Sequence, residues 1–451
     1  MAAARLAREA ERDHEDDMTP VAANRGALAA AVDADRLWAR HMAMARHGAR
    51  ADGGVDRQAL SSEDAAARCE LTAWGRAIGL EASTDAIGNL FLRLVGADPS
   101  LPPVMTGSHL DSQPTGGKFD GVYGVLAGLE ALEAMVATGF RPRRSIDLVV
   151  WTNEEGSRFA PGMMGSEAFA GLRRLGEILA VTDAEGITVA AALESCLAAS
   201  PAMPRRPLGG PVAAYLEAHI EQGPVLEAEG RIIGVVSGIQ GKRTFRVQVQ
   251  GEEAHAGTTP RRKRRDALVA AVAMIGALEQ ATADGEDVIK FTIGRLDVTP
   301  NAPSVVPSRV TFSIDLRHPD SATLQRLGDR IADICAAHAG PCTVAVRELT
   351  TAMSLEFPRP IRRMLSDISH GLGYEPLDLV SAAGHDSRQM HHICPSGMIF
   401  VPCRKGISHH IDEWAEAAHL AAGARVLVEA LARLSTADDT KPRRRGTRRE
   451  R

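Results

Sequence analysis

The chain has 451 residues, of which 45 % are apolar and only 4 % aromatic, so two or three domains with a large aliphatic core are expected. The formal net charge of -5 argues against a nucleic-acid-binding protein, and the lack of an apolar run of about 18 residues argues against a membrane partner. Six cysteines without a CxxC pair, and an N-terminus without the apolar stretch of a secretory signal, favour the cytoplasm.

Both ends of the chain are strongly charged. Residues 1–25 carry mixed charges and are expected to form a disordered tail. Residues 436–451 include KPRRRGTRRER, with seven basic residues among eleven. A contact with nucleic acid or a membrane surface is one interpretation of this stretch, and a solvated, disordered tail is the one we favour.

Helices and short apolar strands alternate between residues 26 and 240. This alternation predicts an α/β domain whose sheet is covered by helices on both faces. The expected helices are 26–47, 62–78 and 120–139, and the expected strands lie within 81–96, 103–110, 145–155 and 211–223.

The pattern changes at Gly241. Residues 242–251 alternate apolar and polar side chains, as a half-exposed strand does. Further elements give a β-α-β-β-α-β order, which predicts a compact inserted domain over 241–353. These elements are a helix over 261–281, strands over 287–298 and 309–318, a helix over 321–337 and a strand over 342–349.

The earlier pattern returns over residues 354–435. A helix over 361–372, a buried strand over 397–403 and a long helix over 413–434 are expected there. We therefore predict one catalytic domain in two segments, 26–240 and 354–435, interrupted by a smaller domain.

Potential metal ligands follow four of the apolar strands. The carboxyl ends of strands in an open α/β sheet form a shared crevice, so these side chains are expected to converge. Taken one at a time, a histidine at a strand end or a pair of glutamates is more typical of structure than of metal binding. Together they suit zinc, manganese, cobalt or nickel. The candidates are His109, Glu154, Glu155, His219, His409 and, at the start of a helix, Asp120.

The stretch GSHLDSQPTGGKFDGVYG, residues 107–124, surrounds one histidine and two aspartates with glycines. Asp111 is placed to accept the second ring N–H of His109 and so to set its tautomer; a local turn hydrogen bond is the alternative. The glycines permit a tight turn, and Gly121 and Gly124 are expected to let the next helix pack closely.

Six motifs carry a family resemblance. In chain order they are GSHLDSQPTGGKFDGVYGVLAGLE, TNEEGSRF, EAHIEQGPVLE, GEEAHAGTTP, AGHDS and GMIFVPCRKGISHH. Together they resemble the dinuclear metal-dependent amidohydrolases that include N-carbamoyl-L-amino acid hydrolase, β-ureidopropionase and allantoate amidohydrolase. The resemblance spans residues 31–434. It implies a zinc-exopeptidase-like domain with a central mixed sheet flanked by helices, and an inserted ferredoxin-like α+β domain that acts as lid and forms a homodimer.

The resemblance also implies roles for individual residues. Two divalent ions per subunit, Zn or Mn, Co or Ni, would be held by His109, Asp120, Glu155, His219 and His409, with Asp120 bridging. Glu154 would be the general acid/base, and His255 would reach over the substrate. Gln222 would contact the substrate, and Arg317 would bind its carboxylate. Residues of the inserted domain would be available to the neighbouring subunit's site.

One segment departs from the family pattern. Where relatives carry Asn and Gly in N-V-V-P-G, this chain has Ser304 and Ser308 within NAPSVVPSRV. A hydroxyl is shorter than an amide and offers one donor instead of two, so the substrate contact differs here. Asn301 lies close by. The basic stretch PRRKRRDA is interpreted as a solvated helical turn, and the roles of His385 and Asp386 are left open.

The reaction that these residues favour is hydrolysis of a ureido C–N bond. An N-carbamoyl amino acid would yield the amino acid, ammonia and carbon dioxide. Allantoate amidohydrolysis, and an amidase or deacylase activity on another N-substituted amino acid, are alternatives with the same metal site. A catalytically silent scaffold is disfavoured because Glu154 and the five ligand positions are intact.

Overall fold

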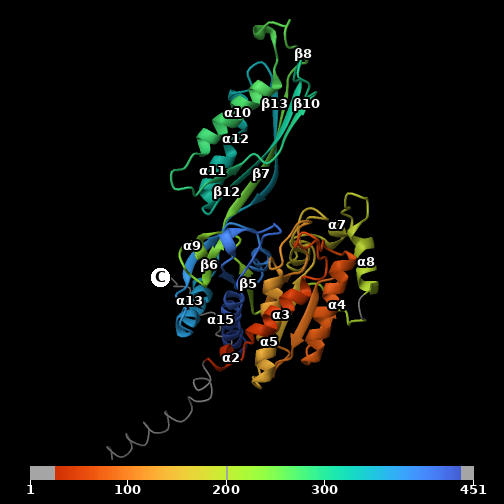
Figure 1. Ribbon diagram of the computed structural model, residues 1–451, viewed down its shortest axis with the longest axis vertical. Helices are drawn as coiled ribbons and strands as arrows, with labels where there is room; N and C mark the ends of the chain where they lie inside the picture. The colour runs from red at the N-terminus through yellow and green to blue at the C-terminus, as the bar shows by residue number, and fades with distance from the viewer. Residues whose placement is uncertain (1–25, 200–201, 438–451) are drawn as a thin grey trace, which may run out of the picture. The chain divides into compact units, whose positions relative to one another are not determined.

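The computed structural model describes residues 26–199 and 202–437, which form two compact units (Figure 1). The first comprises the described residues up to Val236, Phe357–Asp378 and those from His385 onward. The second comprises Ser237–Glu356 and Leu379–Gly384. The sequence placed the inserted segment at 241–353 and did not anticipate the short second piece. The tail predicted over 1–25 lies outside the described residues. Of the tail predicted over 436–451, only residues 436 and 437 are described.

A mixed sheet is the centre of the first unit. Its strand order is β1-β2-β4-β3-β5-β16-β6, and the last strand continues into the second unit. Strands β4, β3, β5 and β16 run parallel, and their neighbours pair antiparallel. The bounds are β1 Glu81–Thr84, β2 Leu90–Leu94, β3 Val104–His109, β4 Ile146–Trp151, β5 Ala214–Ile220, β6 Gly234–Ile239 and β16 Ser396–Val401.

Alternate side chains of these strands enter two different cores. Leu148 and Val150 of β4 join the core formed with helices on one face, whereas Val149 and Trp151 join the core on the other. The first face is covered by α2 Ala27–Ala30, α3 Ala34–Met44, α4 Ser62–Ala77, α5 Val122–Ala137, α13 Arg359–Gly371 and α15 Ala417–Thr436. The opposite face is covered by α6 Met164–Phe169 and α14 Asp386–Met390. The expected α/β architecture with helices on both faces is confirmed.

Several predicted helix boundaries in the first unit are wrong. The helix expected over 26–47 is two helices, because Asp33 caps α3 by accepting a hydrogen bond from the backbone N–H of Arg36. The helix expected from Glu413 begins at Ala417, because the Glu413 side chain is engaged elsewhere. No element was expected over 156–210, yet α6, α7 Leu175–Leu179 and α8 Val189–Ala199 lie there. Helices as short as α6 and α7 show no readable helical period.

The second unit contains a sheet of order β10-β12-β7-β13, with β9 also paired to β12. This is the strand order of a ferredoxin-like β-α-β-β-α-β unit. Helices α10, α11 and α12 share one core with a single face of the sheet (Figure 1). The bounds are β7 Gly241–Gln250, α10 Ala267–Thr282, β9 Lys290–Thr292, β10 Leu296–Thr299, β12 Arg309–His318, α11 Ser321–Asp329, α12 Ile331–Ala337 and β13 Thr343–Ala352.

Two helix boundaries in this unit also differ from expectation. The helix expected from Arg261 begins at Ala267, because Asp266 caps it with hydrogen bonds from the N–H groups of Leu268 and Val269. The helix expected over 321–337 is interrupted at Arg330. Three short pairings were not expected. They involve β8 Ala254–His255 with β11 Val305–Val306, β14 Leu355–Glu356 with β6, and β15 Leu377–Ser381 with β6.

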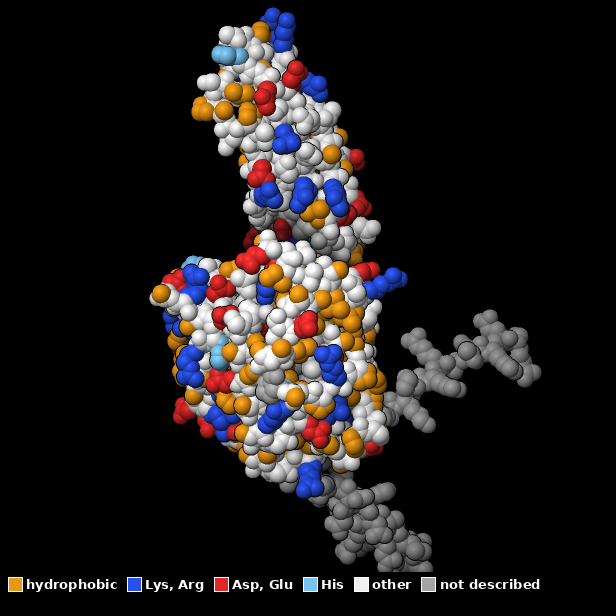
Figure 2. Space-filling view, turned by 90° about the vertical axis from the view of Figure 1, so that its right-hand side faces the viewer, with side chains coloured by type: hydrophobic (Ala, Val, Ile, Leu, Met, Phe, Trp, Pro, Cys, Tyr) orange, Lys and Arg blue, Asp and Glu red, His pale blue; other side chains and the backbone are white. Residues whose placement is uncertain are grey.

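The surface of the first unit mixes side chains of different kinds. On the face shown in Figure 2, charged and hydrophobic side chains of the first unit are interspersed, as is typical of a protein surface in water. Within the described residues, no helix is both long and apolar enough to cross a membrane.

Gly124 determines how closely α5 approaches the sheet. A Cβ atom at this position would lie 2.4 Å from the carbonyl oxygen of Ala218 in β5 and 2.8 Å from Cβ of Ser108 in β3. The absence of a side chain therefore lets α5 pack directly against the two strands that carry His109 and His219.

Gly124→Ala should lower the free energy of unfolding by about 1–3 kcal/mol, because the backbone of β5 must shift to accept the methyl group. The measurement is urea unfolding followed by circular dichroism. Gly176→Ala is the matched control, since a Cβ atom there meets no neighbour within 4 Å. It should leave stability unchanged or raise it by up to about 1 kcal/mol. Equal effects of the two substitutions would contradict the packing argument.

Candidate metal centre

The carboxyl ends of the four parallel strands bring the predicted ligands together. His109 is the last residue of β3, and His219 is the penultimate residue of β5. Glu154 and Glu155 lie in the loop after β4, and His409 lies in the segment after β16. Asp120 immediately precedes the turn that leads into α5. Residues 300 positions apart in the chain therefore meet at one edge of one sheet, as the sequence predicted.

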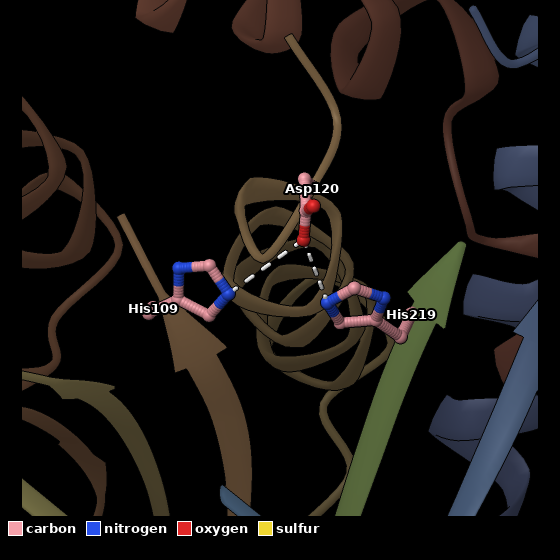
Figure 3. Close-up of side chains that lie close together, drawn as sticks. All are labelled: His109, Asp120 and His219. Carbon is pink, nitrogen blue, oxygen red and sulfur yellow. Dashed lines mark ion pairs between the residues drawn. The ribbon is translucent and has the colours of Figure 1, made fainter. Parts of the chain in front are cut away.

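Asp120 lies between two groups of potential ligands. Its Oδ1 is 3.2 Å from Nε2 of His219 and 3.7 Å from Nε2 of His109, whose rings point toward it from β5 and β3 (Figure 3). Its Oδ2 is 3.1 Å from Nε2 of His409, which in turn is 3.3 Å from Oε2 of Glu155. The first group is His109, Asp120 and His219, and the second is Asp120, Glu155 and His409. One carboxylate thus faces both groups, as a bridging ligand must.

The backbone sets the tautomers of the two buried histidines. Nδ1 of His109 lies 2.9 Å from the carbonyl oxygen of Asp111, and Nδ1 of His219 lies 2.8 Å from the carbonyl oxygen of Ile220. A carbonyl can only accept a hydrogen bond, so Nδ1 carries the proton in both rings. Nε2, the nitrogen that faces Asp120 in each ring, is then the one left to exchange a proton for a metal ion.

Asp111 acts differently from the expectation. The ring N–H of His109 donates to the backbone carbonyl oxygen of Asp111. The carboxylate oxygen Oδ1 of Asp111 is 3.7 Å from the same ring nitrogen, Nδ1. The carboxylate instead accepts hydrogen bonds from the backbone N–H groups of Glu154 at 3.2 Å and Glu155 at 3.1 Å. Asp111 therefore orients the two glutamates, because the loop after β4 leaves these N–H groups without strand partners.

Gly121 is required by the position of the His109 ring. Its φ of 65° lies in the left-handed region, and a Cβ atom there would lie 2.3 Å from the ring. A side chain at this position would displace the imidazole. The glycine expected to allow close approach in this turn thus lies directly against a ligand.

Buried acids dominate the electrostatics of the centre. Burial, followed by repulsion from Asp386 and Glu155, raises the pKa of Glu154 well above its usual range. Burial and the charge of Asp120 raise the pKa of Glu155 to about 8. Despite burial, hydrogen bonds from His219 and His409 hold the pKa of Asp120 well below its usual value.

The negative charge of Asp120 raises the pKa values of two of the histidines. The pKa of His219 is lowered by burial but raised more by Asp120, to about 9 overall, and the hydrogen bond to Asp120 raises that of His409 to about 9. In the part of the chain that the structure describes, the ion pairs of Asp120 are all to histidines. Divalent ions could therefore replace protons on these rings and relieve the repulsion between the acids.

The two groups differ in exposure. The side chains of His109 and His219 are 3 % and 1 % exposed, whereas that of His409 is 48 % exposed. A small molecule therefore reaches the centre most directly at the second group. Gln222 lies there too, and its Nε2 donates to Oδ2 of Asp120 at 2.8 Å.

The other predicted site residues lie in the second unit. Arg317 of β12 pairs with Asp315 through two hydrogen bonds and also donates to the carbonyl oxygen of Ala382. Nδ1 of His255 accepts hydrogen bonds from the N–H groups of Gly257 and Thr258. Ser304 lies beside His255, because Val305 is the strand partner of His255. Asn301 is exposed in the same loop and has a positive φ of 56°.

Several polar neighbours of the centre were not identified from the sequence. Gln113 donates to Oε2 of Glu155 at 2.8 Å, and Glu413 contacts the backbone of Asp120. Glu217 is buried in β5 and accepts a hydrogen bond from Ser108. His385, a residue noted from the sequence with its role left open, packs its ring edge-on against that of His219 at 4.6 Å. The only signal for Gln113 and Glu413 was their proximity in sequence to ligands, which does not reveal side-chain direction.

Comparisons with known proteins identify a matching family and similar chains. Residues 105–433 match the family described as Peptidase family M20/M25/M40. The N-carbamoyl-L-amino-acid amidohydrolase of Rhizobium meliloti is 38 % identical over 414 residues, covering 90 % of this chain and 97 % of that protein. The allantoate amidohydrolase of Bacillus subtilis (strain 168) is 33 % identical over 397 residues, covering 87 % and 95 %.

A solved structure extends the comparison to three dimensions. An amidase of the hydantoinase/carbamoylase family from Burkholderia multivorans is 40 % identical, covers 90 % of this chain and 98 % of its own, and superposes with a TM-score of 0.83. The chain therefore belongs to peptidase family M20/M25/M40. The family resemblance seen in the sequence and the mixed α/β fold class are confirmed.

His409→Ala should remove one ligand of the second group and lower the metal content from about two ions per chain to about one, since the first group keeps its ligands. The measurement is elemental analysis after dialysis against a fixed concentration of Zn²⁺. His410→Ala is the matched control, because His410 is the adjacent histidine and contacts Asp412 instead. Unchanged metal content in His409→Ala would exclude His409 as a ligand.

Proposed function

We propose that the chain hydrolyses the C–N bond of an N-carbamoyl-L-amino acid, giving the amino acid, ammonia and carbon dioxide. The observation that carries this proposal is the position of Asp120 between two ligand groups, with the carboxylate of Glu154 3.5 Å from His109. The relative from Rhizobium meliloti, named for this reaction, supports the choice of bond.

The centre would hold two divalent ions, Zn²⁺ or Mn²⁺, Co²⁺ or Ni²⁺. Imidazole and carboxylate ligands suit all four. His109, His219 and Asp120 would hold the first, and Asp120, Glu155 and His409 the second. Bound ions would polarise the ureido carbonyl and lower the pKa of a shared water molecule.

Glu154 would carry the proton during the reaction. Burial and acidic neighbours raise the pKa of its carboxyl group. A raised pKa suits a residue that must accept a proton and then release it. The N–H of Glu154 is fixed by Asp111, so the carboxylate is held beside the ligands. Glu154 would take a proton from the water and deliver it to the leaving nitrogen.

Arg317 would bind the substrate carboxylate. Asp315 and Ala382 use three of its five N–H groups, which leaves one on each terminal nitrogen. Two parallel N–H groups match the two oxygens of a carboxylate. The side chain is already held in place, so little conformational entropy is lost on binding.

His255 would stabilise the oxyanion of the tetrahedral intermediate. Since Nδ1 accepts two backbone hydrogen bonds, the ring carries its proton on Nε2. An N–H donor aimed at a developing negative charge is a common source of catalysis. Gln222, Asn301 and Ser304 would contact the remainder of the substrate.

Allantoate is the second candidate substrate. The relative from Bacillus subtilis named allantoate amidohydrolase supports it. Allantoate also carries ureido groups and a carboxylate, so the roles of Glu154 and Arg317 would be the same. Another N-substituted amino acid, cleaved by an amidase or deacylase activity, is a third possibility with the same residues.

The second unit would act as a lid and form a homodimer. Its helix α10 exposes Val269 and Val272, which are 61 % and 60 % accessible and lie one helical turn apart. An apolar stripe of this kind favours burial against a second copy.

The six cysteines are unpaired, which supports the predicted cytoplasmic location.

The test is ammonia release by protein preloaded with Mn²⁺, Co²⁺ or Zn²⁺. N-carbamoyl-L-α-amino acids should be hydrolysed, with N-carbamoyl-β-alanine and allantoate as the ureido alternatives and N-acetyl amino acids and dipeptides as controls. Glu154→Gln should keep the metal and lose at least about 100-fold in kcat, because the proton acceptor is gone. Turnover of the controls alone would defeat the proposal, and an active Glu154→Gln would defeat the role of Glu154.

Arg317→Ala should raise KM for carboxylate substrates about 10- to 100-fold with a smaller change in kcat, as expected for loss of charged hydrogen bonds. Arg317→Lys should recover only part of this, since an ammonium cannot bind a carboxylate through two parallel bonds. Arg309→Ala, on the exposed start of the same strand, is the control. Steady-state kinetics on the best substrate gives the comparison, and an unchanged KM in Arg317→Ala would exclude the carboxylate contact.

A further inference from the structure

Glu413 is a buried carboxylate that joins two distant parts of the centre. Its Oε1 accepts hydrogen bonds from the backbone N–H groups of Phe119 at 2.8 Å and Asp120 at 3.0 Å. Its Oε2 lies 2.9 Å from the hydroxyl oxygen of Ser408. The residue is 2 % exposed. One carboxylate thus connects the turn that carries Asp120 with the segment that carries His409.

The connection reaches one oxygen of Asp120 and not the other. The hydroxyl oxygen of Ser408 is 2.8 Å from Oδ2 of Asp120, the oxygen that faces His409. Oδ1 faces His109 and His219, which are held by strands β3 and β5. Both groups share Asp120, but the second is also linked to Glu413 through Ser408, whereas the two histidines of the first are held by the sheet.

The surroundings of Glu413 are built to hold it. A Cβ atom on Gly117 would lie 2.2 Å from the carboxyl carbon of Glu413, so the turn leaves room for this carboxylate only because residue 117 is glycine. Phe119 and Trp414, the neighbours in sequence of Asp120 and Glu413, pack against each other at 5.8 Å. Trp38 of α3 packs against both rings. The two segments are thus joined by polar and aromatic contacts together.

We propose that Glu413 is a positioning residue for the second metal ion, the one that Asp120, Glu155 and His409 would hold. It orients Asp120 through two backbone N–H groups and the segment before His409 through Ser408. The inference rests on the two-ion centre of the proposed function and is independent of the substrate. Loss of partners that orient ligands typically weakens metal binding by about 10- to 100-fold.

The experiment is titration of the chelator-treated full chain with Zn²⁺, read by calorimetry and elemental analysis. Glu413→Ala should bind the first ion as the wild type does and the second about 10- to 100-fold more weakly. Glu413→Gln should recover part of the loss, because its amide oxygen still accepts the two backbone hydrogen bonds. Ser408→Ala should weaken the second ion alone. Asp412→Ala, an exposed carboxylate next to Glu413, should bind both ions normally.

Cobalt gives an independent readout. The visible spectrum of chain loaded with two Co²⁺ ions should change in Glu413→Ala only in the component that appears with the second equivalent. Wild-type affinity for both ions in Glu413→Ala, equal weakening of both, or a wild-type chain that binds one ion would each overturn the proposal. If Glu413→Ala does not fold, Ser408→Ala decides: normal binding of the second ion overturns the proposal, and selective weakening supports it.

The outcome is separable from that of the proposed function, because none of these titrations uses a substrate. If the wild-type chain releases no ammonia from any ureido compound and the second ion still depends on Glu413, the proposed reaction fails and the positioning role stands.

Discussion

The carboxylate of Asp120 is the interaction on which the centre depends. Its two oxygens face imidazoles from three separate parts of the chain, with His109 and His219 on one side and His409 on the other. Within the described residues its ion pairs are all with histidines, and each of these is a group that can exchange a proton for a metal ion. The positive φ of Gly121 leaves room for the His109 ring, and the tautomers of His109 and His219 turn Nε2 toward Asp120. These features keep the carboxylate of Asp120 accessible to both ligand groups.

The sheet gives the two sides different rigidity. His109 and His219 end neighbouring parallel strands, whose backbone hydrogen bonds fix their spacing, and α5 packs directly on those strands at Gly124. His409 lies outside any helix or strand, in the loop that follows β16, and is half exposed. A buried, strand-borne group beside an open, loop-borne one suits a centre that must keep its ions and admit a substrate.

Hydrogen bonds from backbone N–H groups orient the loops that carry the ligands. Asp111 holds the two glutamates by their N–H groups, and Glu413 holds the turn of Asp120 in the same way. Loops after parallel strands leave such N–H groups unpaired, and a buried carboxylate satisfies two of them at once. The acids that surround the centre are therefore of two kinds: those with carboxylates directed at the ligand positions, and those that fix the loops from behind.

The sequence by itself determined the fold class, the alternation of strands and helices, the ferredoxin-like order of the second unit and the set of residues at the strand ends. These follow from local periodicity and from the rule that parallel strands share one carboxyl edge. Only the tertiary structure decided that Asp111 bonds through its backbone to His109, that Glu413 is not helical, and that Gln113 and Ser408 contact ligands. Those facts depend on where side chains point after the chain has packed, and contacts between residues nearly 300 positions apart leave no periodic signal in the sequence.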